Sequence, residues 1–530
     1  MTSVGPALDT TVGAFSADAP WSVDPSAMPW RDGIDELRTQ AAARVPDLVR
    51  RRALPNARAT RIGARLQRAL VPWVARNARR RGEPDAQAVL AARLRQAFES
   101  LGPTFIKLGQ FIGSAQGLAP EVWVHEFRTC RDRVAPEPFT HVRRVIEEEL
   151  GRPLDEIFAE LDDAPLAAAS IAQVHAGRLR TGESVVVKVQ RPRIAQTIPR
   201  DLAAMSWFVG VATRAVRPLA LVNLAAYVEL FAETVVEELD FRLEAQNMLD
   251  VAAVLARSDE RSIIVPRPHP ELVTRRILVM ERLDGLSVDD GQVLLDAGID
   301  PAPVFRTLIV SFLEGAMIHG AFHGDLHGGN MVVTADGTAA LYDFGITGRF
   351  PAASRTALLG LMMSAASEDN RTMLTHFRAL GGLPEGADID ELVATLEART
   401  SGEKNPSPEA MVAQMRDTTK MLVGLGARVP KEMFLFVKGM LYLTGAINAL
   451  ATDIDMFAEV GHMFAALNRH EDHLRAAGVE ALPDAEAMTA RMKHQLGISS
   501  DTASLHDLQA ARRERSQEMR AAFRGPSRRR

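Results

Sequence analysis

The fold class can be predicted from two neighbouring motifs. They are His323-Gly324-Asp325-Leu326-His327-Gly328-Gly329-Asn330 and, further on, Asp343-Phe344-Gly345. Asp325 precedes Asn330 by five positions, and Asp343 follows Asn330 by thirteen. Two apolar runs between them are joined by Asp336-Gly337, a strong signal for a hairpin turn. An aspartate can orient or deprotonate a hydroxyl group or water, and oxygen ligands suit magnesium that bridges phosphates. The stretch therefore predicts that Asp325 is catalytic and that Asn330 and Asp343 bind the metal.

These spacings are those of the catalytic loop and the metal-binding tripeptide of protein kinases. Such a site also needs a lysine on a strand, and Lys188 directly follows Val185-Val186-Val187. A turn at 181–183 and an apolar run at 171–179 precede it, so we expect a small antiparallel sheet. Lys188 is predicted to contact the α and β phosphates of a nucleotide and to act in catalysis.

Four acidic residues are candidates for the partner of Lys188, namely Glu237, Glu238, Asp240 and Glu244. We expect residues 225–249 to form one helix, on which positions 237, 240 and 244 share a face. Like charges on one face repel, so pairing with Lys188 and assisting magnesium would explain why they coexist. A merely solvated acidic stripe is the alternative, and both remain open from the residues alone.

The segment 277–285 has the form of a kinase hinge between two lobes. Apolar Met280 occupies the position before the hinge, and Gly285 lets the chain turn into the second lobe. The backbone groups of Glu281 and Leu283 are therefore predicted to bind adenine.

The loop Ala167-Ala168-Ala169-Ser170 stands where protein kinases carry a glycine-rich phosphate loop. Glycine adopts positive φ freely, whereas alanine does so at a cost. We therefore expect this loop to bind the nucleotide, to be stiffer than a glycine-rich loop, and to offer the hydroxyl of Ser170.

The composition limits the class of protein. The chain has 530 residues, of which 47% are hydrophobic and 24% charged, as expected for a bilobal catalytic body with additional helices. The single cysteine, Cys130, excludes an intrachain disulfide and a cysteine-rich zinc site. The N-terminus lacks a signal-peptide pattern, and the apolar runs 202–213 and 439–452 are shorter than the roughly 20 residues that a bilayer requires. We expect a cytoplasmic protein without a transmembrane span.

Positive charge is concentrated in two segments, although the net charge is −5. Residues 44–81 contain twelve Arg and one acidic residue, Asp47, for a net of +11. Residues 512–530 contain eight Arg and two Glu, for a net of +6. Such surfaces attract anionic lipid headgroups. Nucleic acid is not an expected partner, since few aromatic residues are interleaved.

The first basic segment contains a predicted amphipathic helix. Ile62, Leu66 and Trp73 lie on one helical face, and Arg61 and Arg65 flank it. This helix either lies on the inner face of a membrane, as interfacial helices do, or docks on the catalytic body with an arginine-coated outer face. Both interpretations remain open.

With these motifs in hand, the chain resembles the UbiB/AarF family of atypical kinases. The most specific match is LGPTFIKLGQ at 101–110, which contains the K-x-G-Q signature of that family at Lys107 and Gln110. The resemblance implies that this extension folds over the active site as a regulatory lid. Lys107 and Gln110 would point into the site and block the place where a peptide substrate would lie.

The same resemblance implies roles for the acidic residues. Glu244 would be the helix-C glutamate that pairs with Lys188, and Glu238 and Asp240 would form the E-x-D pair of the family. The sequence FIGSAQGLAPEV after Gln110 lacks the more usual Ser-Thr-Arg and downstream Asp, so we expect the lid to sit differently from that of other members. No C-terminal membrane span is recognised, so any membrane contact would be peripheral.

We predict an α+β, bilobal protein-kinase-like fold with a small antiparallel-sheet N-lobe, a helical C-lobe and an N-terminal helical extension. The expected parts are a disordered leader at 1–35, a basic amphipathic helical segment at 36–85, a helical lid extension at 86–160, an N-lobe with a helical insertion at 161–285, a helical C-lobe at 286–495 and a basic tail at 496–530.

The resemblance implies a protein that binds ATP and Mg and acts as an ATPase or as a small-molecule or lipid kinase in prenyl-lipid (quinone-type) metabolism at a membrane. An anionic membrane lipid or a prenyl-lipid intermediate is the expected further partner, and no oligomeric state is assigned. One alternative is a phosphotransferase of the aminoglycoside or choline-kinase type, which should lack the lid. Another is a non-catalytic nucleotide-sensing scaffold that binds lipid, against which the intact Asp325 and Asp343 argue.

Overall fold

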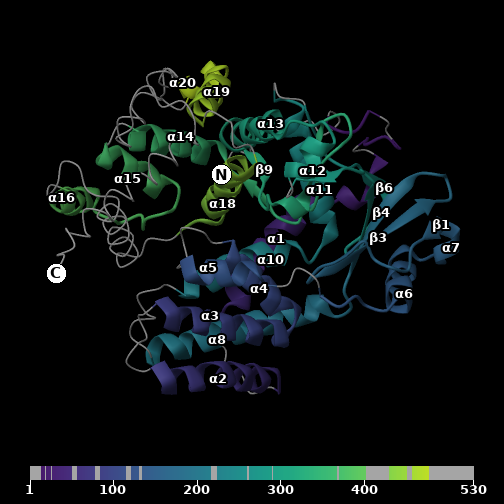
Figure 1. Cartoon of the computed structure of the whole chain (residues 1–530), viewed down its shortest axis with the longest axis horizontal. Helices are drawn as coiled ribbons and strands as arrows, with labels where there is room; N and C mark the ends of the chain where they lie inside the picture. Colours follow the sequence, from purple (N-terminus) through teal and green to yellow (C-terminus); the bar gives the residue numbers. More distant parts are fainter. Residues whose placement is uncertain are drawn as a thin grey trace, which may run out of the picture.

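The computed structural model describes residues 13–17, 20–24, 27–50, 57–77, 84–114, 121–130, 134–215, 224–258, 262–288, 291–366, 369–400, 429–450 and 456–476. These residues form two lobes with a stack of helices along one side (Figure 1). One lobe is built on a small sheet, and the other is mainly helical. This is the predicted bilobal α+β kinase-like fold with an N-terminal helical extension.

The first lobe is an antiparallel sheet made of β1 (Phe158–Leu161), β2 (Ala167–Ala168), β3 (Ala172–Leu179), β4 (Ser184–Gln190), β6 (Pro268–Val273) and β7 (Ile277–Glu281). The strand order is β1-β3-β4-β7-β6, with β2 paired to β3. Val185, Val187 and Val189 of β4 are buried against α6 (Phe139–Leu150) and α7 (Leu154–Ile157). Because side chains alternate along a strand, Lys188 projects from the opposite face of the sheet.

The acidic segment lies between two helices, α10 (Leu224–Glu237) and α11 (Phe241–Leu255). The expectation of one helix over 225–249 is wrong, and positions 237, 240 and 244 therefore share no continuous helix face. Asp240 has extended backbone angles, and its side chain accepts a hydrogen bond from the backbone N–H of Arg242. An aspartate in this N-cap position stabilises the start of a new helix, which explains the break.

The second lobe contains the helices α12 (Gly291–Asp296), α13 (Pro301–Glu314), α14 (Ala352–Ala366), α15 (Asn370–Ala379), α16 (Ile389–Thr400), α18 (Lys431–Leu450), α19 (Met456–Asn468) and α20 (Glu471–Ala476). Its small sheets contain β5 (Ile263–Ile264), β8 (Leu286–Ser287), β9 (Ala321–His323), β10 (Met331–Val333), β11 (Ala339–Leu341) and β12 (Thr347–Arg349). The β10–β11 hairpin confirms the turn predicted at Asp336-Gly337, and Gly337 has the positive φ of 86° that this turn uses. This hairpin separates the two sequence motifs of the site.

One helical stretch among the described residues, Pro301–His319, is long and apolar enough to cross a membrane. Of its most apolar window, 83% is buried inside the protein. It consists of α13 and the turn η3 (Gly315–His319) that continues it, and it packs against α18 and α19. Burial in the second lobe therefore accounts for its apolar composition.

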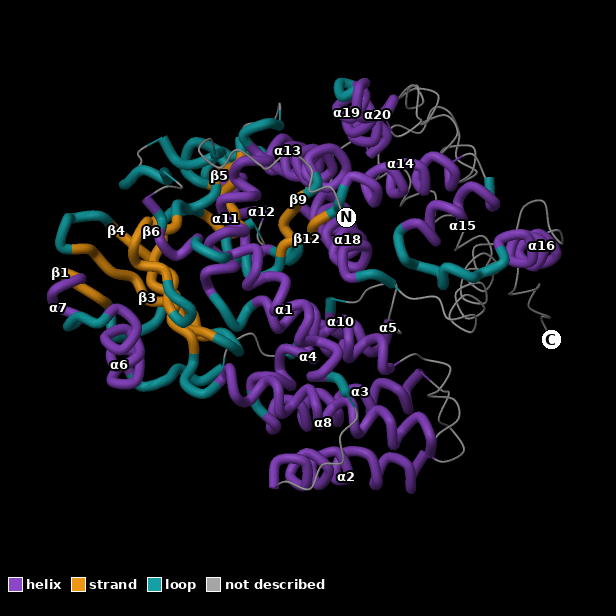
Figure 2. Tube along the Cα trace, turned by 180° about the vertical axis from the view of Figure 1, so that it is seen from behind, coloured by secondary structure: helices purple, strands orange, loops and turns teal. Residues whose placement is uncertain are grey.

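The helical extension contains α1 (Ile34–Leu48), α2 (Ala57–Asn77), α3 (Pro84–Leu101), α4 (Pro103–Gly113) and α5 (Glu121–Arg128), to which α8 (Ile194–Ala215) is added from the insertion. Figure 2 shows α2, α8 and α3 stacked beside α4, while α1 lies between this stack and the two lobes. Gly102, with φ of 104°, makes the sharp turn between α3 and α4. The turn directs the K-x-G-Q helix, α4, toward the centre of the molecule.

The apolar face of the basic helix α2 is buried within the protein. Ile62 and Trp73 are buried, and the Trp73 indole N–H donates to the carbonyl of Ala86, 2.7 Å away. Arg61 and Arg65 are exposed on the outer face. The sequence left two interpretations open for this helix. The structure agrees with the second, because the apolar face docks on the protein's own body. The basic tail 496–530 lies outside the described residues.

A strap formed by residues 13–17 and 20–24 crosses the back of the first lobe. The backbone N–H of Ala14 donates to Ala252 of α11, and the N–H of Val265 donates to the carbonyl of Ala14, each at 2.9 Å. Arg267 donates to the carbonyls of Ser16 and Trp21, at 2.7 and 3.1 Å. The expected disordered leader at 1–35 is therefore wrong for the described part of that range, where backbone hydrogen bonds and an arginine supply the order that composition did not suggest.

We predict that Arg58→Ala detaches α2 from α8. Both nitrogens of the Arg58 fork bind Asp201, at 2.7 and 2.9 Å, and the Asp201 side chain is fully buried. Removing the arginine leaves a buried carboxylate without its cation, which should cost about 2–4 kcal/mol. Chemical unfolding measures this loss, with the exposed Arg65→Ala of the same helix as the control. Equal stabilities for the two variants would contradict the docking described here.

We predict that Arg267→Ala loosens the strap. The change removes two charge-assisted hydrogen bonds and the contact of the guanidinium with the Phe15 ring, 5.0 Å from its centroid. The expected destabilisation is about 2–3 kcal/mol, accompanied by faster proteolysis within residues 13–24. The exposed Arg178→Ala on β3 serves as the control. Unchanged proteolysis of the strap would show that Arg267 does not hold it.

Candidate active site

The centre of the site is an ion-pair cluster around Lys188. Its Nζ lies 2.7 Å from Glu244 Oε1 on α11 and 3.0 Å from Asp343 Oδ1 after β11. The Glu244 side chain is only 2% exposed. Burial opposes the charged lysine, but the two carboxylates outweigh it and raise the pKa of Lys188 above its ordinary value. The cluster therefore joins the sheet, α11 and the Asp343 segment through one ammonium group.

The catalytic loop begins where β9 ends, and His323 fixes its course. The Asp325 backbone N–H donates to His323 Nδ1 at 3.1 Å, so the other ring nitrogen carries the proton and donates to the Tyr342 carbonyl at 2.8 Å. Burial lowers the pKa of His323, which keeps the ring neutral. Asn330 Nδ2 donates to the Asp325 carbonyl at 3.0 Å, leaving Oδ1 of Asn330 as the atom available to a cation.

Asp343 has an unusual backbone. Its φ is 52°, in the left-handed region that Asp tolerates better than most residues. The conformation is held on both sides, because Asn247 Nδ2 donates to the Phe344 carbonyl at 2.9 Å and the buried Phe344 ring packs edge-on against His323. Lys188 holds the pKa of the Asp343 carboxyl below its ordinary range, at about 2.

The lid helix α4 reaches this cluster through Lys107. Its Nζ lies 2.7 Å from Glu238 Oε2, just after the end of α10. Gln110 lies further along α4 and is half-buried. Asp240 is not part of this contact: it caps α11 and pairs with Arg242 at 2.8 Å. The structure thus brings Lys107 and Glu238 together and places Asp240 in a different role.

The hinge residues Glu281 and Leu283 form hydrogen bonds with neighbouring segments of the chain. The Glu281 backbone N–H donates to the Arg267 carbonyl at 2.9 Å, and its side chain accepts hydrogen bonds from Ser16 of the strap and from the Arg267 N–H. Tyr342 Oη donates to the Leu283 carbonyl at 2.6 Å, which connects the hinge to the residue before Asp343. Met280 is buried behind them.

The alanine-rich loop is an ordinary strand edge held by Arg191. Ala167 and Ala168 pair with β3 as β2, and Arg191 Nε donates to the Ala169 carbonyl at 2.9 Å. Among the described residues, the non-glycine positions with positive φ are Arg193 and Asp343, so the alanines carry no such strain. The Ser170 residue is buried. Hydrogen bonds, and not a strained backbone, position this loop, and its stiffness stays a prediction.

The sequence interpretation missed Lys438. This residue lies on α18, and its Nζ forms an ion pair with Asp325 Oδ1. Burial favours the neutral carboxyl, but Lys438 outweighs it and holds the pKa of Asp325 well below its usual range. The only available signal was a lone charge in the apolar run 433–447, and it did not reveal which residue would face it.

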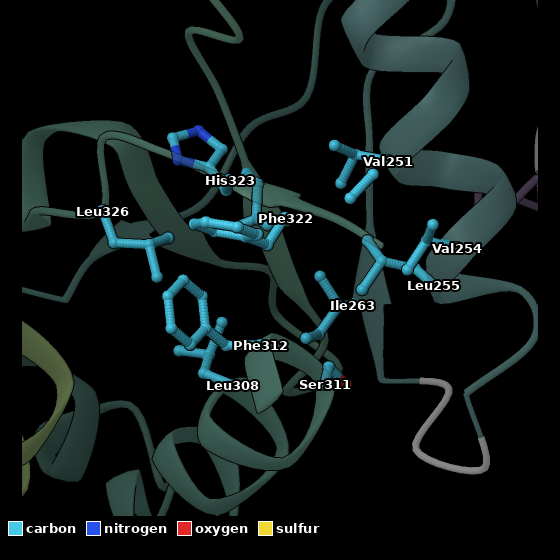
Figure 3. A pocket seen from close by; sticks show the side chains of 12 residues that line it. Val251, Val254, Leu255, Ile263, Leu308, Ser311, Phe312, Phe322, His323 and Leu326 are labelled. Carbon is cyan, nitrogen blue, oxygen red and sulfur yellow. The ribbon is translucent and has the colours of Figure 1, made fainter. Parts of the chain in front are cut away.

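A small cavity lies directly behind the catalytic loop (Figure 3). Its volume is about 20 Å³, and α11, α13, β5 and β9 contribute apolar side chains such as Val251, Leu308, Ile263 and Phe322. This volume holds no more than about one water molecule. The cavity is therefore a packing defect of the core and not the place of a substrate.

Comparisons with known proteins agree with this geometry. The model of the ABC1 atypical kinase-like domain matches residues 129–377. An uncharacterized protein of Mycobacterium tuberculosis is 33% identical over 414 residues, which cover 76% of this chain and 83% of the relative. A probable protein kinase UbiB of Azotobacter vinelandii is 32% identical over 401 residues, covering 73% and 72%.

Two further matches extend the comparison. An uncharacterized aarF domain-containing protein kinase of Arabidopsis thaliana chloroplasts is 31% identical over 397 residues, which cover 69% of this chain and 73% of the relative. A solved structure of a Mycobacterium tuberculosis protein with erythromycin covers 60% of this chain and 80% of that chain, at 22% identity and a TM-score of 0.40. The sequence matches show that the chain belongs to the ABC1 family of atypical kinase-like proteins, in which relatives carry the names UbiB and AarF.

Proposed function

We propose that this protein binds Mg-ATP and catalyses phosphoryl transfer or ATP hydrolysis. The observation that carries the proposal is the placement of Lys188 between Glu244 and Asp343, at 2.7 and 3.0 Å. In active kinases the strand lysine pairs with a helix glutamate and contacts the nucleotide phosphates. The first of these contacts is formed here between Lys188 and Glu244, and Lys188 also pairs with Asp343, the predicted metal ligand.

Magnesium fits the oxygen atoms that the site offers. Asn330 Oδ1 and the carboxylate of Asp343 are hard ligands, and the Asp343 side chain remains 45% exposed. Among the described residues, Glu238 Oε1 is a buried oxygen without a hydrogen-bond partner. Magnesium needs only one or two carboxylates, because water and phosphate oxygens complete its shell. When bound, the ion would neutralise charge on the transferring phosphate.

The other residues have complementary roles in this proposal. Asp325 orients the attacking hydroxyl group or water, while the backbone of Glu281 and Leu283 binds adenine. The loop from Ala167 to Ser170 covers the phosphates. The order of the elements along the chain supports these assignments, since β4 with Lys188 precedes the hinge and the catalytic loop follows it.

The lid distinguishes this site from that of a peptide kinase. α4 carries Lys107 to Glu238 beside the cluster, so a buried helix occupies the side from which an extended substrate would approach. The acceptor is therefore water, a small molecule or a lipid. The names of the relatives suggest prenyl-lipid (quinone-type) metabolism, and the exposed Arg61 and Arg65 of α2 provide a surface for peripheral contact with an anionic membrane.

We predict that Asp343→Asn abolishes magnesium-dependent binding of ATP. The change removes a charged ligand of the ion and also the second carboxylate bound to Lys188. Thermal unfolding with ATP, in the presence of Mg²⁺ or of EDTA, measures the effect. The highly exposed Asp472→Asn on α20 is the control and should keep the wild-type response. A full Mg-ATP stabilisation in the Asp343 variant would refute the assignment.

We predict that Lys107→Ala changes the chemistry more than the fold. Removing this ammonium group opens space and alters the electrostatic field beside the phosphates. We expect a changed rate of ATP turnover or new autophosphorylation, measured by phosphate release and by incorporation of labelled phosphate. Arg128→Ala, on the exposed surface of α5, should shift stability by no more than about 0.5 kcal/mol and leave both activities as they are. Identical activities in both variants would place Lys107 outside the reaction.

A further inference from the structure

Lysine is rare in this chain, and the lysines among the described residues lie in or next to the site. The sequence contains 7 Lys and 55 Arg, so arginine supplies most of the positive charge. The four lysines among the described residues all form ion pairs with carboxylates in or next to the site, namely Lys107 with Glu238, Lys188 with Glu244 and Asp343, Lys431 with Glu237, and Lys438 with Asp325. The ammonium group of lysine is a compact point charge on a flexible stem, with three donors that can turn toward different carboxylates.

One face of α18 packs against the site. Lys431, Phe434, Leu435 and Lys438 lie on it, at the spacing that brings side chains to one side of a helix. Phe434, Leu435 and Lys438 contact elements of the site, whereas Lys431 forms its ion pair outside it. Lys431 Nζ lies 2.7 Å from Glu237 at the end of α10, and the Phe434 ring lies 4.8 Å from a phenylalanine ring of α4, between centroids.

The contact of α18 with the catalytic loop is especially close. A Cβ atom added to Gly324 would lie 3.1 Å from Leu435 Cδ1 and within 3.0 Å of the Ile346 side chain and carbonyl. The loop therefore passes next to α18 with no room for a side chain at this glycine. Three positions further along α18, Lys438 reaches the carboxylate of Asp325. The helix thus fixes both the backbone and the side chain of the loop.

The catalytic loop carries no lysine or arginine beside Asp325; its one basic side chain there is that of His327, whose Nε2 lies 4.0 Å from Asp325 Oδ2. Its residues 326–329 are Leu, His, Gly and Gly, so neither lysine nor arginine stands between Asp325 and the metal-binding Asn330. Four carboxylates gather in the site, those of Asp325, Asp343, Glu238 and Glu244, against the three lysines 107, 188 and 438. Without Lys438 one cation fewer would offset these carboxylates, at the place where anionic phosphate must approach.

We propose that Lys438 is a positioning residue for phosphoryl transfer: it holds the carboxylate of Asp325 through Oδ1 and supplies, from the second lobe, the lysine cation that the catalytic loop itself does not carry. This inference rests on the proposed function. A carboxylate held on one oxygen presents the other to the attacking hydroxyl group or water. The ammonium group also offsets the charge of Asp325, so that the terminal phosphate can approach it.

The test is steady-state ATP turnover of the full chain with Mg²⁺, using Lys438→Met, Lys438→Gln and the matched control Lys431→Met. Lys431 lies two turns away on the same face of α18 and makes an ion pair outside the nucleotide site. We expect kcat to fall about 100-fold in both Lys438 variants, because Met removes the donor to Asp325 and Gln is shorter and uncharged, so neither holds the carboxylate in the same position. KM and the affinity for a fluorescent ATP analogue should stay within about threefold of wild type, since the groups that bind the nucleotide remain.

The possible outcomes distinguish the role of Lys438 from the proposed function. Lys438→Gln keeps a hydrogen-bond donor and protects against misfolding, and retained stabilisation by Mg-ATP shows that each variant is folded. Lys431→Met should keep kcat within about threefold of wild type. Turnover in the Lys438 variants that equals that of Lys431→Met, or exceeds wild type, overturns the role of Lys438 while leaving the proposed function intact. Absence of both Mg-ATP binding and turnover in the wild-type chain overturns the proposed function, and this inference with it.

Discussion

The ion pairs of Lys188 with Glu244 and Asp343 are the interaction on which the rest of the site depends. They require β4 to pair with β3 and β7 in the register that turns Lys188 away from the valine-packed face. They also require α11 to begin at Phe241, which Asp240 secures as its N-cap. A buried ammonium between two carboxylates is stable only while all three groups stay in place, since removing one leaves an uncompensated charge. The cluster therefore couples the two lobes.

The remaining charges reach the site from separate parts of the chain. The lid helix contributes Lys107, and α18 contributes Lys438, which binds the catalytic aspartate. Behind the site, the strap of residues 13–17 and 20–24 joins the hinge to α11 through Glu281 and Ala252. The strap thus holds two elements that set the geometry of a kinase-like site. They are α11, which carries Glu244, and the hinge. This arrangement favours a preformed site, which reduces the cost of reorganisation when the nucleotide binds.

Motifs that are local in sequence were predictable from the residues, whereas the long-range pair of Lys188 with Glu244 was expected only from the family resemblance and other long-range contacts were not foreseen. The turn at Asp336-Gly337 and the spacing from Asp325 to Asn330 depend on neighbouring residues only, and the structure forms that hairpin and that loop. The break before α11 was missed because helical periodicity outweighed the cap signal of Asp240. Lys438 lies 113 positions from Asp325, and nothing in an apolar helix indicates which acid its lysine will meet. The strap was missed because its composition resembles that of disordered leaders, whereas its order comes from Arg267.

Calorimetric titration of ATP into the wild-type chain, with Mg²⁺ and then with EDTA, tests the central claim most directly. The cluster of Lys188, Asn330 and Asp343 predicts saturable binding of one nucleotide per chain that depends on the metal, since the carboxylate and amide oxygens act on phosphate only through the ion. Absence of binding, or the same affinity with and without Mg²⁺, would contradict the assignment of a Mg-ATP site to these residues.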